Sequence, residues 1–355
     1  EPHPEILERK KQGLPEMPVL RESDAAYYLR EEAGGMILGI YEKGAPVCYV
    51  DGPKDDCQYE LFNGELDRIM PHIDRCINRV PAFGEVGIKD IYNGAIAYTP
   101  DGNPIVGPAP GLKNFWLNEG HSFGITAAGG AGWQLAEWIV DGEPTVDMMG
   151  VDPRRFGPYA TRGYLKEKNE EAYANVFTTH YPDEERSGAR PLKTAPCYDR
   201  MKALGAVFGT VYGWERPNWF MPSADYSLSA EELNQEDPAK VLMNKNHATA
   251  LEDGRIVEKN SFRRSNYFEH VGNECKHVND KVGLLDMSAF AKCVVKGPGA
   301  EEWLEYIFAN KMPKAIGRIS LVHMLSLNGG VRAEFTVYKT GPQSYYLVSA
   351  GAFET

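Results

Sequence analysis

A short turn bounded by glycines is the first place in the sequence where backbone groups could act on a ligand. Its residues are Gly120, His121, Ser122, Phe123, Gly124 and Ile125. The turn follows strand-like residues 115–118, and a glycine-rich stretch at 127–132 leads into an expected helix from Trp133 to about Val140. This order puts backbone N–H groups and the positive end of a helix at one place. Glycine also permits a tight turn that binds nothing, and the spacing alone leaves both interpretations open.

Two further places carry side chains that could act on a small molecule. Tyr27 and Tyr28 are adjacent in a strand-like run, so one ring is expected to face the core and the other the opposite face. Glu334 follows the hairpin signal at 328–330, and a carboxylate there could hold or relay a proton. The structural alternatives are a pair of strand aromatics for the tyrosines and a solvent-facing strand residue for Glu334.

Three arginines could clamp a substrate carboxylate, because the guanidinium fork matches that group. They are Arg155, Arg190 and Arg216, and each is equally well explained as an ion pair. His121 has a plain interpretation too, as a hydrogen-bonding scaffold within its turn. The Walker pattern and the Gly-x-Gly-x-x-Gly dinucleotide fingerprint are absent from the sequence, so we expect that this chain does not hold a nucleotide by itself.

Composition limits the class of protein. A chain of 355 residues suffices for two or three domains, and 43% hydrophobic with 11% aromatic residues can fill their cores. A formal net charge of -12 argues against a nucleic-acid partner, and no apolar run is long enough to predict a membrane span. The first residues lack the pattern of a signal peptide. The six cysteines lack CxxC spacing, which predicts reduced thiols and neither a disulfide framework nor a metal site.

The order of the expected strands and helices predicts an α+β fold with a mixed or antiparallel sheet, because no repeated βαβ pattern occurs. These elements must position the candidate residues. Strand-like runs at 26–29, 36–41 and 47–50, separated by glycine and proline turns, predict a β-meander. Apolar spacing over residues 61–80 predicts a helix. These elements together predict a small sheet with a helix on one side.

The second half of the sequence predicts a separate unit from residue 261 onward. Apolar spacing predicts helices over 267–282 and 300–308. Strand-like runs lie at 292–295, 320–327, 334–338 and 345–348. The composition suggests four parts, namely residues 1–150, a middle domain at 151–225, a linker or insertion at 226–260, and a final domain at 261–355.

Several segments of the first half resemble one flavoprotein family. Residues 92–94 and 99–107 are similar to the segment where D-amino-acid-oxidase-type flavoproteins leave the substrate sheet and re-enter the FAD domain. Residues 18–21 with 27–31, residues 190–194 with 198–200, and the tryptophan-rich 213–220 resemble the dimethylglycine and sarcosine dehydrogenases. The resemblance implies that residues 1–150 are the C-terminal half of an FAD-dependent oxidoreductase.

The flavoprotein resemblance assigns roles to particular residues. It implies that the turn from Gly120 to Ile125 lies against FAD, with a positive φ at Gly124. It also implies an active-site tyrosine in the strand of Tyr27 and Tyr28, and either residue could be the match. The family's flavin-attaching and substrate-contacting histidines would lie before Glu1, so the resemblance implies an internal fragment.

The last hundred residues resemble the start of an aminomethyltransferase-type folate domain, at residues 261–264, 286–288 and 329–337. This implies contact between tetrahydrofolate and Glu334, Phe335 and Thr336. Many relatives carry Asp at the position of Glu334, and the Glu arm is one methylene longer. The domain is expected to be truncated, because the chain stops directly after a strand.

The combined resemblance implies oxidative N-demethylation of dimethylglycine, or of a sarcosine-like N-methyl amine. FAD would take a hydride, tetrahydrofolate would capture the one-carbon unit, and electrons would pass to an electron-transferring flavoprotein or to oxygen. The expected location is a bacterial cytoplasm or the mitochondrial matrix. Two rivals remain: a non-catalytic relative such as a regulatory subunit of pyruvate dehydrogenase phosphatase, and a folate-dependent methyltransferase without redox chemistry.

Overall fold

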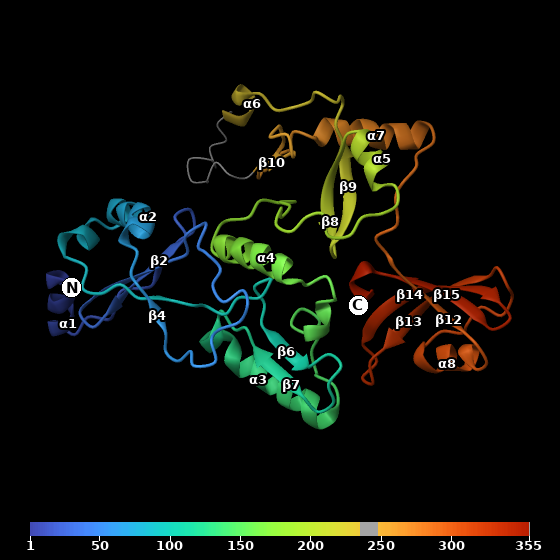
Figure 1. Ribbon diagram of the computed structural model, residues 1–355, viewed down its shortest axis with the longest axis horizontal. Coiled ribbons are helices and arrows are strands. Elements are labelled where there is room, and N and C mark those ends of the chain that lie inside the picture. The colour runs from blue at the N-terminus through green and yellow to red at the C-terminus, as the bar shows by residue number, and fades with distance from the viewer. Residues whose placement is uncertain (235–247, 355) are drawn as a thin grey trace. The chain divides into compact units, whose positions relative to one another are not determined.

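A computed structural model describes residues 1–234 and 248–354 of the chain (Figure 1). The chain divides into two compact units. Unit 1 comprises Glu1–Ala189, Ser229–Ala250 and Lys259–Arg263, and unit 2 comprises Arg190–Leu228, Leu251–Glu258 and Arg264–Thr355. Helices accompany antiparallel strand pairs in each unit, so the predicted α+β class with antiparallel sheets is confirmed. Of the expected linker at 226–260, residues 235–247 lie outside the described residues.

Most helices and strands of the first half belong to unit 1. They are α1 (Pro4–Lys11), β1 (Leu20–Glu22), β2 (Tyr27–Glu32), β3 (Gly35–Ile40), β4 (Leu61–Phe62), α2 (Leu66–Arg79), η1 (Pro81–Glu85), β5 (Asn93–Gly94), β6 (Ile105–Pro108), β7 (Trp116–Glu119), α3 (Gly124–Asp141), η2 (Pro153–Arg155) and α4 (Arg162–Asn175). Two later elements, α6 (Ala230–Asn234) and β10 (Ala248–Ala250), also lie in this unit. The predicted helix over 61–80 therefore exists as α2 and begins later.

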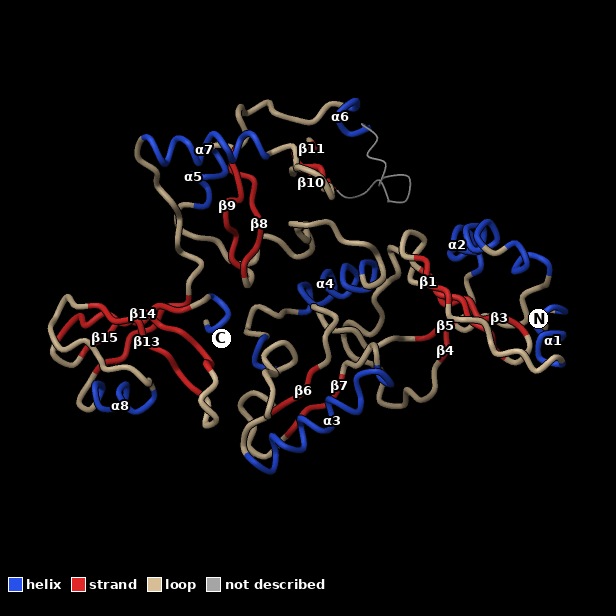
Figure 2. Tube along the Cα trace, turned by 180° about the vertical axis from the view of Figure 1, so that it is seen from behind, coloured by secondary structure: helices blue, strands red, loops and turns tan. Residues whose placement is uncertain are grey.

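A three-stranded antiparallel sheet, β1-β2-β3, forms the first core (Figure 2). Tyr27 and Leu29 alternate inward from β2 and pack with the buried Cys76 of α2. The meander is confirmed, but the strand expected at 47–50 is wrong. Tyr49 there has a φ of 54°, which breaks an extended run, and β1 supplies the third strand instead.

The antiparallel pair β6 and β7 packs against α3. Val106 of β6 is fully buried, and Trp138 of α3 lies 6.0 Å, centroid to centroid, from Trp116 of β7. The prediction that this helix starts near Trp133 is wrong, because α3 already begins at Gly124. The glycine-rich stretch lowers helix propensity, but packing of the helix on the strands outweighs that weak preference.

Unit 2 begins with a hairpin and a helix and ends with a four-stranded sheet. Its elements are α5 (Tyr198–Ala203), β8 (Ala206–Val211), β9 (Trp214–Phe220), α7 (Phe268–Asp280), β12 (Ala291–Lys296), α8 (Ala300–Ile307), β13 (Ile319–Leu325), β14 (Val331–Gly341), β15 (Ser344–Ser349) and η4 (Gly351–Phe353). Strand β11 (Ile256–Lys259) lies at a boundary between the units. Buried Val207, Trp219 and Val257 form the core beside the β8–β9 hairpin.

The sheet of unit 2 has the order β12-β15-β14-β13 and is antiparallel throughout. Figure 2 shows α8 beside this sheet, and Leu304 of α8 packs with Val322, Val337 and Leu347 of the strands. The hairpin predicted at 328–330 is confirmed, with Gly329 at a φ of 81°. The helices and strands predicted over this region are confirmed, and β14 is longer than expected.

Candidate functional site

The glycine turn connects the end of β7 to the start of α3. Gly120 has a φ of 69°, and a Cβ atom there would lie 2.8 Å from Cγ2 of Thr99. Gly124 is already helical, and a Cβ atom there would meet nothing within 4 Å. The expectation of a positive φ at Gly124 is therefore wrong. The chain reverses directly after the strand, so Gly120 is the residue that must be glycine.

The remaining residues of the turn carry unused hydrogen-bonding capacity. Helix α3 starts after Phe123 without a side-chain cap, and the first turn of a helix leaves N–H groups without intrahelical partners. Nε2 of His121 lies 2.7 Å from Oδ1 of Asn118, while its Nδ1 is buried without a partner among the described residues. The Ile125 side chain is fully exposed. These features leave a place where a polar, planar group could bind.

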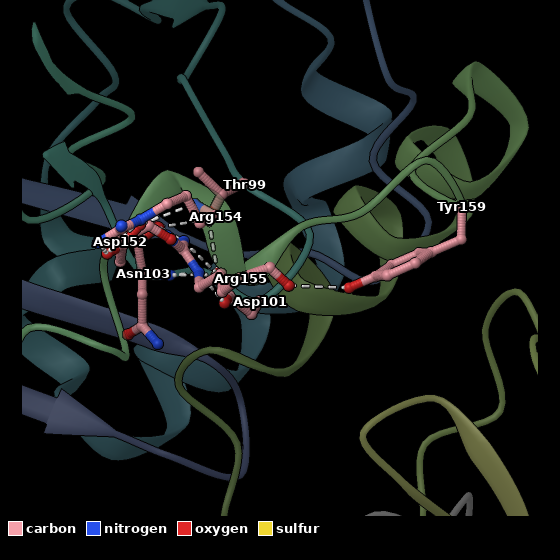
Figure 3. A network of polar contacts seen from close by, with 7 residues as sticks. All are labelled: Thr99, Asp101, Asn103, Asp152, Arg154, Arg155 and Tyr159. Atoms are coloured by element: carbon pink, nitrogen blue, oxygen red, sulfur yellow. Dashed lines mark hydrogen bonds and ion pairs between the residues drawn. The ribbon is translucent and has the colours of Figure 1, made fainter. Parts of the chain in front are cut away.

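A network of polar contacts fixes the neighbouring turn at residues 99–103 (Figure 3). The Arg155 guanidinium donates to both carboxylate oxygens of Asp101, at 2.7 and 3.0 Å, and to the carbonyl oxygen of Asn103 at 3.0 Å. The Thr99 hydroxyl donates to the same carbonyl at 2.6 Å. Arg155 is thus engaged within the protein, and it holds in place the threonine that packs against Gly120.

The structure separates the two candidate tyrosines. The Tyr27 side chain is 1% exposed in the core beneath β2, where burial and the nearby Cys76 raise its pKa to about 12. The Tyr28 ring lies on the other face of the strand and fills the space over Gly39, its cross-strand partner, which has no side chain. Of the two tyrosines, Tyr28 is therefore the partly exposed one, on the face of β2 opposite the core.

Aromatic rings connect Tyr41, which follows β3, with the glycine turn. Tyr28 is close enough to Tyr41 to contribute to the raised pKa of that residue, whose first cause is burial. The rings of Tyr41 and Phe177 lie 4.2 Å apart, and those of Phe177 and Phe123 lie 6.0 Å apart. The Arg21 guanidinium stacks over Phe177 at 4.1 Å. Residues far apart in sequence thus form one aromatic cluster within unit 1.

A hollow of about 470 Å³ adjoins this cluster within unit 1. Tyr98 and Asp101 line it from the 99–103 side, Phe123 from the start of α3, and Lys168 and Glu171 from α4. Lys168 donates to Glu171 at 2.5 Å, so the wall of α4 is internally charge-paired. This wall could not be predicted from the sequence, because α4 carries no motif that points to a ligand.

The other two candidate arginines lie in unit 2. Arg190 donates to both carboxylate oxygens of Glu215, at 2.9 and 2.7 Å, and to the carbonyl of Phe208. It is therefore an internal ion pair. Arg216 lies exposed on β9. Neither residue lies with the glycine turn or with Tyr28 in the same unit.

Glu334 and Thr336 lie on the face of the four-stranded sheet opposite to α8, and the Glu334 side chain is 59% exposed. Phe335 alternates to the other face, where its ring lies 5.2 Å from that of Phe308 in the core. The structure therefore brings two of the three predicted folate contacts together. It also places His323 of β13 opposite Glu334, a residue that the sequence reasoning missed.

The described residues form neither a metal site nor a membrane-spanning helix. No group of three or more His, Cys, Asp or Glu side chains in this part of the chain could hold a metal ion. No helix within residues 1–234 and 248–354 has the length and apolar character to cross a bilayer. All six cysteines are unpaired thiols.

Comparison with family models divides the chain into three matches. Residues 1–138 match the FAD dependent oxidoreductase family, residues 141–195 its central domain, and residues 197–355 the GCVT N-terminal domain. Most of unit 1 falls within the two oxidoreductase matches, and most of unit 2 falls within the GCVT match. The four-part division expected from composition stays a prediction.

Relatives with a curated description narrow the class. Mitochondrial dimethylglycine dehydrogenase of Mus musculus is 34% identical over 358 residues, covering 99% of this chain and 37% of the relative. Mitochondrial sarcosine dehydrogenase of Homo sapiens is 29% identical over 362 residues, covering 99% and 38%. The mitochondrial pyruvate dehydrogenase phosphatase regulatory subunit of Mus musculus is 28% identical over 336 residues, covering 94% and 35%.

These matches define an FAD-dependent oxidoreductase joined to a folate-type GCVT domain. Within that class, the chain belongs to the dimethylglycine dehydrogenase and sarcosine dehydrogenase family. It spans a little more than a third of the curated relatives that it matches.

Proposed function

We propose that this chain is part of an FAD-dependent enzyme that removes an N-methyl group from dimethylglycine and passes the one-carbon unit to tetrahydrofolate. The observation that carries the proposal is the order of modules. An FAD dependent oxidoreductase match at 1–138 precedes a GCVT N-terminal domain match at 197–355. Oxidation of an N-methyl group produces an electrophilic one-carbon unit, and a second module that binds a carrier for it is its natural partner.

The glycine turn supports FAD binding in two respects. Helix α3 begins without a side-chain cap, and His121 keeps a buried Nδ1 without a partner in the described residues. FAD, when bound, supplies the hydride acceptor. The turn from Gly120 to Ile125 would stabilise negative charge on the reduced ring through its N–H groups and the helix start.

Tyr28 is proposed as the substrate-side phenol. Its ring lies on the face of β2 that the aromatic cluster connects with Phe123, whereas Tyr27 is enclosed in the core. The Tyr28 hydroxyl would orient the substrate amine. The surrounding rings would exclude water from the reacting carbon, which strengthens every polar interaction made there.

Glu334 and Thr336 are proposed as tetrahydrofolate contacts on the open face of the sheet in unit 2. The Oε2 atom of Glu334 lies 3.2 Å from Nε2 of His323, and the Glu334 side chain is 59% exposed. Capture of a one-carbon unit by an amine nitrogen releases a proton, and the Glu334 carboxylate would accept it. Phe335 would support the strand from the core side.

The finer features of the reaction are likewise proposals. Sarcosine or another N-methyl amine is the alternative substrate, and an electron-transferring flavoprotein or oxygen would accept the electrons. The location would be a mitochondrial matrix or a bacterial cytoplasm. The alternative function is regulatory, because a phosphatase regulatory subunit is 28% identical to this chain over 336 residues.

An anaerobic experiment on the holoenzyme that carries this chain tests the proposal. Dimethylglycine should bleach the flavin absorbance, and tetrahydrofolate should convert released formaldehyde into methylene-tetrahydrofolate. Trimethylglycine is the matched control, since its quaternary nitrogen has no lone pair to support hydride loss and should leave the flavin oxidised. A holoprotein whose flavin stays oxidised with both dimethylglycine and sarcosine would support the regulatory alternative.

A further inference from the structure

A histidine that no motif singles out lies beside Glu334. His323 of β13 is the direct cross-strand partner of Glu334 in β14. Its Nε2 atom lies 3.2 Å from Oε2 of Glu334 on the open face of the sheet. At this distance the imidazole and the carboxylate form an ion pair when the imidazole is protonated.

The loop that follows α8 holds His323 from the other side. Oδ1 of Asn310 accepts from the backbone N–H of His323 at 2.9 Å and lies 3.3 Å from its Nδ1. The N–H of Ala309 donates to the carbonyl of His323 at 2.9 Å. The backbone of His323 is therefore anchored through both its N–H and its carbonyl group, and its ring lies beside the Asn310 amide.

A purely structural role explains this arrangement poorly. The His323 and Glu334 side chains are 36% and 59% exposed, and ion pairs at such surfaces contribute little to stability. The core of the sheet lies on its other face, around Leu304 and Val337. What the contact bears on is the Glu334 carboxylate, whose Oε2 atom faces Nε2 of His323.

We propose that His323 is a positioning residue for Glu334. In this role Nε2–H donates to Oε2 and thereby turns Oε1 toward the one-carbon carrier, while Asn310 holds the backbone of His323. The inference rests on the proposed function, because it takes Glu334 to be the group that meets tetrahydrofolate. Held carboxylates react from one geometry, whereas a free Glu side chain samples several rotamers.

The first test needs no activity. The 355-residue chain, labelled with ¹⁵N-histidine, gives ring nitrogen resonances for its eight histidines, and His323→Gln identifies the resonances of His323. Glu334→Gln should move the Nε2 resonance of His323, because it removes the charge that Nε2 faces. His277, exposed on α7 of the same unit, is the control and should not move. An Nε2 resonance of His323 that does not respond to Glu334→Gln would overturn the proposal.

The second test uses the holoenzyme with saturating tetrahydrofolate. His323→Ala should lower the rate of one-carbon capture about tenfold, since a hydrogen bond to a charged group is lost. The Kd of tetrahydrofolate should stay within about twofold, and flavin reduction by dimethylglycine should be unchanged. His323→Gln should recover most of the rate, because its amide can still donate to the carboxylate, and His277→Gln should match wild type.

The outcomes separate the inference from the function on which it rests. If Glu334→Gln leaves capture intact, the proposed role of Glu334 is wrong. If Glu334→Gln abolishes capture while His323→Ala behaves as wild type, only the positioning role is wrong. If His323→Gln is as impaired as His323→Ala, a hydrogen bond is not what His323 supplies, and the positioning role is again overturned.

Discussion

The two candidate sites are built in different ways. In unit 1 the glycine turn is held by single side-chain contacts, with Thr99 against Gly120 and Arg155 on Asp101. In unit 2 the position of Glu334 follows from the register of β13 with β14. Register is maintained by many backbone hydrogen bonds, whereas a side-chain contact can be removed by one substitution. Single substitutions should therefore disturb the first site more than the second.

The largest effect is expected at the glycine turn. Gly120→Val should lower the free energy of unfolding of unit 1 by about 2–3 kcal/mol, because it combines a positive φ with a collision at Thr99. Gly124→Ala is the matched control. It should be neutral or slightly stabilising, since the site is helical and open. Pulse proteolysis in urea, with fragments identified by mass spectrometry, reports unit 1 separately.

The same two variants test the flavin assignment in the holoenzyme. Gly120→Val should also reduce flavin content, while Gly124→Ala should not alter the turn. Equal flavin content in Gly120→Val and wild type would contradict the placement of FAD against this turn. Equal stability of the two variants would contradict the backbone conformation itself.

The second effect is expected at the arginine that fixes the 99–103 turn. Arg155→Ala should cost unit 1 about 1–2 kcal/mol, because the Arg155 side chain is only 11% exposed and the Asp101 carboxylate loses a two-point partner. Arg154, the next residue, is 59% exposed and pairs with Asp152, so Arg154→Ala should cost less than about 0.5 kcal/mol. The same proteolysis experiment measures both variants. If Arg155→Ala and Arg154→Ala lower the free energy of unfolding equally, the contacts of Arg155 in Figure 3 contribute no more than a surface ion pair.

Much of the fold could be predicted where the apolar residues recur with a single clear period, either that of a strand or that of a helix. The strands and the hairpin of the sheet in unit 2 follow from alternation and from Gly329, whose φ of 81° suits glycine. The start of α3 could not be predicted, since glycines at 127–132 resemble a loop until the helix packs on β6 and β7. The strand predicted at 47–50 does not form, although its residues are apolar, because the backbone of Tyr49 is in the left-handed region.

The candidate site was predictable in part, for a related physical reason. Adjacent residues such as Tyr27 and Tyr28 are known to face opposite ways, but only the partner strands decide which face is the core. His323 could not be found, because its relation to Glu334 exists only through the register across a hairpin. Arg155 was recognised as a candidate, but its partner Asp101 is 54 residues away.

The third effect compares the two tyrosines. Tyr28→Phe should slow flavin reduction by dimethylglycine about tenfold, a barrier change of about 1.4 kcal/mol, because the hydroxyl that orients the amine is lost. Tyr27→Phe should leave the rate unchanged. The Tyr27 hydroxyl lies in the core with no partner of ordinary geometry in the described residues, although Cys76 is near enough to affect its pKa. Stopped-flow traces that rank the variants in the opposite order would reverse the assignment.

The smallest effect is expected in the sheet of unit 2, at a carboxylate away from both sites. Glu301 of α8 accepts hydrogen bonds from Lys314 and Lys339, each at 2.7 Å, and from the Tyr345 hydroxyl. These bonds, that of Lys314 first, lower the pKa of Glu301 from 4.5 to about 2. A carboxyl group whose pKa is lowered on folding stabilises the protein above its unfolded pKa. That contribution is lost as the pH falls from about 4.5 through about 2.

The urea concentration that half-unfolds unit 2 should fall as the pH falls from 4.5 to 2, and it should fall less steeply in Glu301→Gln than in wild type. Pulse proteolysis with pepsin measures this midpoint. Glu302→Gln is the control, because Glu302 is the next residue of the same helix and makes no ion pair with the described residues. The Glu301 side chain is 31% exposed, so solvent weakens its ion pairs and the change should be modest. A midpoint that falls as steeply in Glu301→Gln as in wild type would place the acid sensitivity in other carboxylates. The sheet register that positions Glu334 would then have no electrostatic support from α8.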